Sequence, residues 1–196
     1  MNKKAIATAV IGLSLLWTGC WQKSVHPFYQ DDDIVFEKRL IGTWMEQKEK
    51  EDDDPQSWSF SEGRENSYQL DIKGGDTTME FDAHLFELGG FRFLDLYSQR
   101  RAVSEIPAHH LFRIGKIGSA LELQVLSLDW IKEWSTEHPE GIAHVQAPDS
   151  EKPEDPDKGE VILTAGTKAL QRFVLAHLDD EGFFDENGEL IRVEGR

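Results

Sequence analysis

Residues 77–98 read TTMEFDAHLFELGGFRFLDLYS. Apolar residues stand at every second position from residue 79 to residue 85, and Gly89-Gly90 separates this run from a second one, Phe91–Ser98. A period of two is typical of a strand with one buried face, and a glycine pair between two such runs is typical of a hairpin turn. The stretch therefore predicts two long antiparallel strands joined by a tight turn.

Shorter runs of the same kind lie on both sides of this hairpin. We expect further strands at residues 41–45, 57–61, 67–73, 109–116, 120–128 and 160–163. The apolar spacing changes to three or four at Leu128–Glu137 and again before His177, which predicts two short helices in the C-terminal third. Asn187-Gly188 predicts a small hairpin over residues 183–193. The whole pattern predicts a mainly β protein with an antiparallel up-and-down meander or barrel of about eight strands.

Gly42-Thr43-Trp44 opens the first of these strands, after a short helical turn or two in residues 34–40. A Gly-x-Trp motif at the start of an up-and-down meander resembles the lipocalin-like barrels, and the resemblance covers roughly residues 34–178. It implies that Trp44 closes one end of the barrel and that a small apolar ligand occupies the cavity. A barrel of this size either holds one ligand or is filled by its own side chains, and strand number alone does not decide between them.

Bulky aromatic side chains are expected to point into the barrel. As candidates to line a cavity we take Trp58, Phe60, Phe81, Phe93 and Phe112.

The first twenty residues have a different pattern. Asn2-Lys3-Lys4 precedes an apolar run over residues 5–16, and Thr18-Gly19 stands before Cys20, the single cysteine of the chain. Such a segment is typical of a secretory signal, and its apolar run is too short for a transmembrane helix, which needs roughly 20 residues. Because Gly19 directly precedes Cys20, the segment resembles a bacterial lipoprotein signal. The resemblance implies cleavage between Gly19 and Cys20 and lipidation of the Cys20 thiol with acyl chains such as palmitate.

The same resemblance suggests how the chain is organised. We expect a signal peptide over residues 1–19, an exposed tether over residues 20–33 and one barrel domain over residues 34–196, with an acidic, Pro-rich loop near 147–159. Uncharacterised bacterial lipoproteins of this size look similar. In Gram-negative lipoproteins an Asp after the lipidated cysteine favours the inner membrane. Trp21 stands there instead, which implies the outer membrane, facing the periplasm, if the host has two membranes.

The chain is strongly acidic, with a formal net charge of −16. Loss of Lys3 and Lys4 with the signal segment changes this charge from −16 to −18. Such a surface repels phosphate backbones and anionic lipid headgroups. We therefore expect no nucleic-acid partner, and we expect membrane attachment to come from the acyl chains on Cys20.

The sequence contains no Gly-x-Ser-x-Gly, Gly-x-Gly-x-x-Gly, Walker or His-Glu-x-x-His motif. His109-His110 is the most tempting metal-ligand pair, but adjacent residues of a strand point to opposite faces and cannot both bind one ion. Residues 185–189 lack the ligand spacing of a calcium loop. We therefore expect a non-enzymatic protein without catalytic residues, metal or cofactor.

Two non-enzymatic functions remain open, and an enzyme with a pair of carboxylates in a cleft is a third. The first is a lipid-anchored envelope protein that binds a small apolar ligand in its barrel. The second is an interaction or scaffolding lipoprotein with a filled barrel, which presents residues 128–159 to an envelope protein. The space inside the barrel distinguishes between them.

Overall fold

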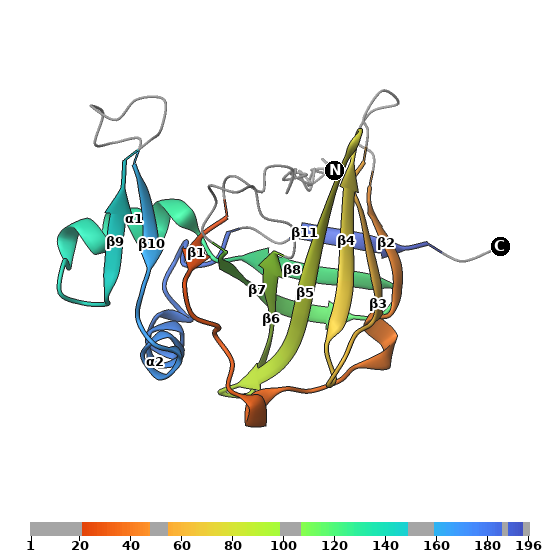
Figure 1. Cartoon of the computed structure of the whole chain (residues 1–196), viewed down its shortest axis with the longest axis horizontal. Coiled ribbons are helices and arrows are strands. Elements are labelled where there is room, and N and C mark those ends of the chain that lie inside the picture. Colours follow the sequence, from red (N-terminus) through yellow and green to blue (C-terminus); the bar gives the residue numbers. More distant parts are fainter. Residues whose placement is uncertain (1–20, 48–54, 99–106, 149–158, 186–187, 194–196) are drawn as a thin grey trace, which may run out of the picture.

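The computed structural model describes residues 21–47, 55–98, 107–148, 159–185 and 188–193. Within them, an 8-strand antiparallel sheet closes into a barrel (Figure 1). Its strands are β2 (Gly42–Glu46), β3 (Ser57–Glu62), β4 (Tyr68–Gly74), β5 (Thr77–Leu88), β6 (Phe91–Ser98), β7 (His109–Ile117), β8 (Ala120–Val125) and β11 (Gly188–Arg192). The predicted fold class is confirmed.

The hairpin predicted from residues 77–98 is formed by β5 and β6. Pairing runs from Phe81 with Ser98 to Leu88 with Phe91, and Gly89 and Gly90 make the turn with φ of 61° and 84°. Glycine adopts such positive φ values without steric cost, which explains why two of them stand together here. The side chains that this hairpin turns into the barrel are almost completely buried: Phe81, Ala83, Leu85, Leu94 and Leu96.

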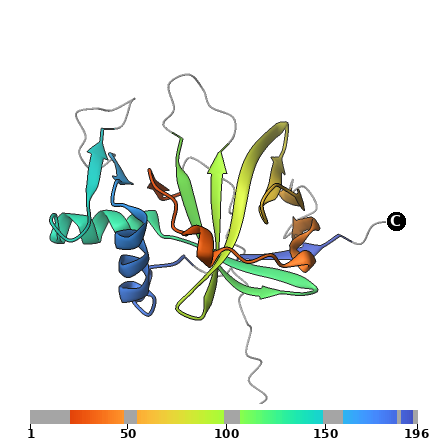
Figure 2. The ribbon, with the colours of Figure 1, turned by 60° about the horizontal axis from the view of Figure 1, so that its bottom comes forward.

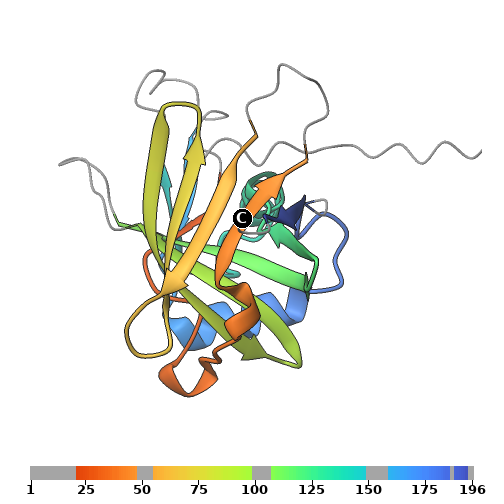
Figure 3. The same cartoon turned by 90° about the vertical axis from the view of Figure 1, so that its right-hand side faces the viewer.

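The barrel is closed by β11. This strand pairs with β8 on one side and with β2 on the other, so the expected small hairpin over residues 183–193 is wrong. The physical reason is that the apolar side chain of Leu190 is buried only when β11 fills the gap between two strands that are distant in sequence. In Figure 3, the orange strands β2 and β3 and the olive hairpin of β4 and β5 cross in front of the green strands.

The predicted strand at Glu160–Leu163 exists as β10, but it lies outside the barrel. It pairs antiparallel with β9 (His144–Ala147) and parallel with the short β1 (Lys23–Ser24), which in turn pairs with β7. Both predicted helices are present, α1 (Leu128–Glu137) and α2 (Thr167–His177). They stand with β9 and β10 on one side of the barrel (Figures 1 and 2).

This side layer and the outer barrel wall share a second apolar core. Its largest side chains are aromatic and come from the barrel, from α2 and from the N-terminal and C-terminal segments: Phe28, Phe86, Phe93, Phe173, Phe183 and Phe184. Ser127 caps α1, because its Oγ accepts a hydrogen bond from the backbone N–H of Trp130 at 3.4 Å. Both helices contribute to the second core, α1 through Ile131 and α2 through Leu170, so packing against the barrel holds them in place.

The segment expected to be an exposed tether, residues 20–33, is packed against the domain from Trp21 onward. The exposed fractions of Trp21, Gln22 and Phe28 are 3%, 1% and 1%. Two short 3₁₀ turns follow, η2 (Asp31–Asp33) and η3 (Lys38–Leu40). The few apolar residues of this segment follow neither a helical nor a strand period, so its burial could not be predicted from the sequence.

Several predictions fall outside the described residues. These predictions concern the signal segment, the cleavage and lipidation site at Gly19 and Cys20, and most of the acidic loop near 147–159. Among the helices that are described, none is long and apolar enough to cross a membrane.

Candidate functional site

The barrel interior is the first candidate site. Of the five side chains predicted to line a cavity, Trp58, Phe60, Phe81 and Phe112 belong to the interior cluster, each at most 3% exposed. Phe93 does not. It lies in the second core, with its ring centroid 5.5 Å from Phe86, because Leu94 and Leu96 take the inner positions of β6.

Trp21 enters this interior from the N-terminal segment. Its ring is perpendicular to Phe112, with centroids 4.9 Å apart, and lies 6.1 Å from Trp58 and 6.0 Å from Phe81. Edge-to-face contacts at these distances are favourable packing for aromatic rings. These side chains thus pack together in the space in which the resemblance would place a ligand.

Trp44 is fully buried and is the cross-strand partner of Trp58. Its indole N–H donates to the carbonyl of Leu40 at 2.9 Å, and the guanidinium of Arg192 lies over its ring at 4.4 Å from the centroid. Gly42 has a φ of 131°, and a Cβ there would lie 2.8 Å from Nη1 of Arg192, so the motif needs glycine at this position. That Trp44 closes one end of the barrel stays a prediction from the resemblance, and the contact with Arg192 was not predicted from the sequence.

His109 and His110 point to opposite sides of β7, as the strand geometry predicts. His110 faces Trp21, with ring centroids 5.5 Å apart, and its Nδ1 lies 3.1 Å from the carbonyl oxygen of Gln22. Burial lowers the pKa of His110 to about 4, so this ring is neutral at pH 7. His109 faces outward.

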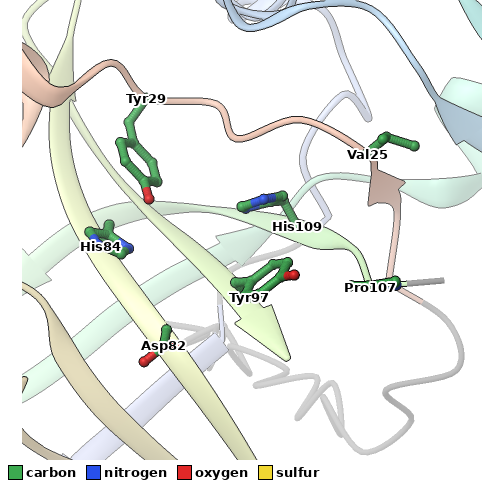
Figure 4. Close-up of a pocket in the computed structure, with 7 residues that line it drawn as sticks. All are labelled: Val25, Tyr29, Asp82, His84, Tyr97, Pro107 and His109. Carbon is green, nitrogen blue, oxygen red and sulfur yellow. The ribbon is translucent and has the colours of Figure 1, made fainter. Parts of the chain in front are cut away.

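A groove of about 460 Å³ on the outer barrel wall is the second candidate site (Figure 4). It lies between strands β5, β6 and β7 and the N-terminal segment. Its lining side chains are Val25, Tyr29, Asp82, His84, Tyr97, Pro107 and His109. In Figure 4, Tyr29 and His109 reach into the groove from opposite sides.

Asp95 lies beneath this groove with no exposed surface. Its Oδ1 is 2.7 Å from Nδ1 of His109, and its Oδ2 accepts the backbone N–H of Phe28 at 2.9 Å. A carboxylate only accepts, so Nδ1 of His109 is the donor and Nε2 is the nitrogen left for other contacts. A buried carboxylate requires such partners, and these two tie the N-terminal segment to the barrel.

Tyr29 stacks on His84, with ring centroids 4.5 Å apart and 24° between the planes. Burial, followed by the nearby carboxylates, raises the pKa of Tyr29 to about 12. Burial lowers the pKa of His84 below its ordinary value, and its Nδ1 has no hydrogen-bond partner among the described residues. Tyr29 is therefore protonated and His84 neutral at pH 7.

Asp95 and His109 form an Asp-His pair, with Oδ1 of Asp95 2.7 Å from Nδ1 of His109. The described lining of the groove contains no Ser, Thr or Cys, the neighbouring Ser24 donates its hydroxyl to the carbonyl of His26 at 2.8 Å, and no group of three or more His, Cys, Asp or Glu side chains among the described residues could hold a metal ion.

This groove was not predicted from the sequence, although the register of the β5–β6 hairpin already places four polar or aromatic residues on one face. A two-residue turn at Gly89-Gly90 fixes the register of the hairpin, which places His84 opposite Asp95 and Asp82 opposite Tyr97. All four side chains then share the outer face. Tyr29 and His109 also line the groove, but they come from other parts of the chain, so their positions could not be predicted from the hairpin register.

A third feature is a groove of about 480 Å³ between the end of α1 and α2. Half of its lining residues are glycine or alanine, among them Gly141, Ala143, Gly166 and Ala169, and Trp134 also lines it. The Trp134 ring lies 4.8 Å from Phe173 and stacks on His138 at 4.8 Å. It belongs to the segment that the second functional hypothesis presents to a partner.

A scan of protein-family models, a search of curated proteins and a search of solved structures found no match to this chain.

Proposed function

We propose that the protein is a non-enzymatic, lipid-anchored lipoprotein of the bacterial cell envelope that works as an interaction or scaffolding module. Its filled barrel would serve as a rigid body, and residues 128–159 would face a protein partner. The observation that carries this proposal is the packed barrel interior, in which Trp21 joins Trp58, Phe81 and Phe112. An apolar ligand would have to displace these side chains, which disfavours the ligand-binding alternative.

The groove beside Trp134 supports the choice of the interacting face. Trp134 is half-buried on α1, and Glu137, one turn further along, is exposed. Tryptophan is enriched among residues that dominate binding energy at protein interfaces. The small residues across the groove leave room for a partner side chain next to the indole ring.

Site-specific photo-cross-linking in cells tests this interaction. A photo-reactive residue at Glu137 is expected to capture one defined envelope protein, and the same residue at the exposed Asp71 on β4 is the matched control. Trp134→Ala should abolish the product made from position 137. Equal products from positions 137 and 71, or no product from position 137, would contradict the proposed partner surface.

Membrane attachment has its own test. If Cys20 carries acyl chains, metabolic labelling with an alkyne fatty acid should mark the protein, and Cys20→Ser should lose both the label and membrane fractionation. Each buried CH₂ contributes about 0.8 kcal/mol to membrane affinity, so loss of the chains should release the protein almost completely. A labelled Cys20→Ser variant would contradict the lipidation site.

The position of Trp21 also bears on the anchor. A residue spans at most about 3.3–3.6 Å, so an acylated Cys20 would lie next to the barrel and not at the end of a long linker. Membrane attachment through Cys20 would therefore hold the barrel close to the bilayer.

A further inference from the structure

The groove between the end of α1 and α2 has a largely apolar lining. Its lining residues all lie in the described ranges 107–148 and 159–185, and none is within five positions of an undescribed residue. Besides glycine and alanine, the lining contains the large apolar side chains of Trp134, Ile142 and Phe173. The volume of about 480 Å³ leaves room for a side chain of a bound segment.

Trp134 is held in place by its neighbours before any partner binds. Its ring packs against Phe173 and stacks on His138, each with ring centroids 4.8 Å apart, and lies 5.2 Å from the ring of His177. A Cβ atom at Gly141 would overlap the indole, so the backbone of this turn lies directly against the ring. A side chain that is already ordered loses little conformational entropy on binding, which favours Trp134 as an anchor.

The groove also carries one acidic and one basic side chain. Glu140 comes from the turn after α1 and Arg172 from α2, and both are exposed. Within the part of the chain that the structure describes, neither side chain has a hydrogen bond or an ion pair, and the two do not pair with each other. Charged groups around an apolar patch are typical of the rim of a protein interface, where opposite charges on the partner determine specificity and register.

We propose that this groove binds a short segment of the protein partner in which one apolar side chain, next to Trp134, stands between a basic and an acidic residue. The basic residue faces Glu140 and the acidic residue faces Arg172. This inference rests on the proposed interaction function and adds the chemistry of the partner segment. A segment with two charges of the same sign fits less well, because one of them meets a like charge in the groove.

NMR titration of the protein with short peptides tests the proposal, with the indole N–H of Trp134 as the signal. The probes are acetyl-Lys-Leu-Glu-amide, the reversed acetyl-Glu-Leu-Lys-amide and acetyl-Gln-Leu-Gln-amide, all with zero net charge. The charged peptide whose order fits the groove should bind at least roughly threefold more tightly than the Gln peptide. No saturable shift, equal affinity for all three peptides, or tighter binding of free L-leucine than of either charged peptide would overturn the proposal.

Substitutions locate the two charges. Arg172→Gln and Glu140→Gln should each reduce the preference for the charged peptide, whereas Lys168→Gln, at an exposed position of α2 outside the groove, should leave it unchanged. Glu140→Arg combined with Arg172→Glu should reverse which order of the charged peptide binds better. Circular dichroism checks that each variant is folded. If Arg172→Gln and Lys168→Gln have the same effect, the acidic residue does not face Arg172 and the proposal fails.

Cross-linking in cells separates this inference from the proposed function. The double variant Glu140→Gln, Arg172→Gln should lower the yield of the product captured from position 137. A product that is unchanged in this variant but lost in Trp134→Ala would keep the proposed partner surface and overturn the charge assignment. Absence of any product from position 137 would instead contradict the proposed function, and the peptide titration would then decide whether the groove selects this chemistry.

Discussion

At the scale of single residues, buried polar groups connect the N-terminal segment to the barrel. Asp95 holds His109 and the backbone of Phe28, while the carbonyl of Gln22 lies 3.1 Å from His110. The partners in these contacts are far apart in the sequence, so no local pattern reveals them. They explain why residues 21–33 are part of the domain although their sequence resembles a linker.

His110 makes the stability of the protein depend on pH. Burial lowers its folded-state pKa from 6.5 to about 4, so between these values the unfolded chain binds a proton that the folded protein does not. The free energy of unfolding should therefore fall as the pH drops through this window, by roughly 2–3 kcal/mol at pH 4.5.

Urea denaturation at pH 7 and pH 4.5 measures this effect, with His110→Gln as the non-titrating comparison. The loss of stability between the two pH values should be smaller in the variant by that amount. An equal loss in both proteins would mean that His110 titrates normally in the folded state.

At the scale of elements, regular alternation and turn chemistry identified most of the barrel. Each strand from β2 to β8 pairs with the next strand in the sequence. Local sequence patterns were therefore enough to predict these strands and their order. Both helices were visible from their three- and four-residue spacing. Four of the five proposed interior aromatics lie inside, and Phe93 was misplaced because β6 has apolar residues on both faces.

The sequence did not predict the pairing of strands whose partners are distant along the chain. β10 and β11 are short, and either could have completed the barrel on composition alone. The choice depends on the second core: β10 is held outside by β9 and β1, which leaves the gap between β2 and β8 to β11. Such a choice is made by packing of the whole chain and not by the propensity of five residues.

The role of β11 gives a direct prediction. Leu190 is fully buried in the barrel interior, whereas its neighbour Glu189 is exposed. Leu190→Ala should lower the free energy of unfolding by about 2–5 kcal/mol, and Glu189→Ala by less than about 0.5 kcal/mol. Urea unfolding of the two variants is the measurement. Similar small changes in the free energy of unfolding of both variants would contradict the placement of residues 188–192 as a barrel strand.

At the scale of the whole molecule, the chain builds one barrel and covers part of its outer wall with the N-terminal segment around Phe28 and with residues between β8 and β11. The N-terminal segment contributes Trp21 to the interior and Phe28 to the second core, and the residues after β8 contribute α1, β9, β10 and α2. The barrel is thus a support that both regions share.

Titration with apolar probes tests the filled barrel most directly. The chain from Cys20 onward and its Trp21→Ala variant are titrated with indole and with a panel of fatty acids and retinoid-like probes, followed by calorimetry and fluorescence. The wild-type chain should show no saturable binding, whereas Trp21→Ala should bind indole, because an apolar cavity left by a large side chain accepts a matching ligand. Saturable, one-to-one binding of an apolar probe in the barrel of the wild-type chain would contradict the account.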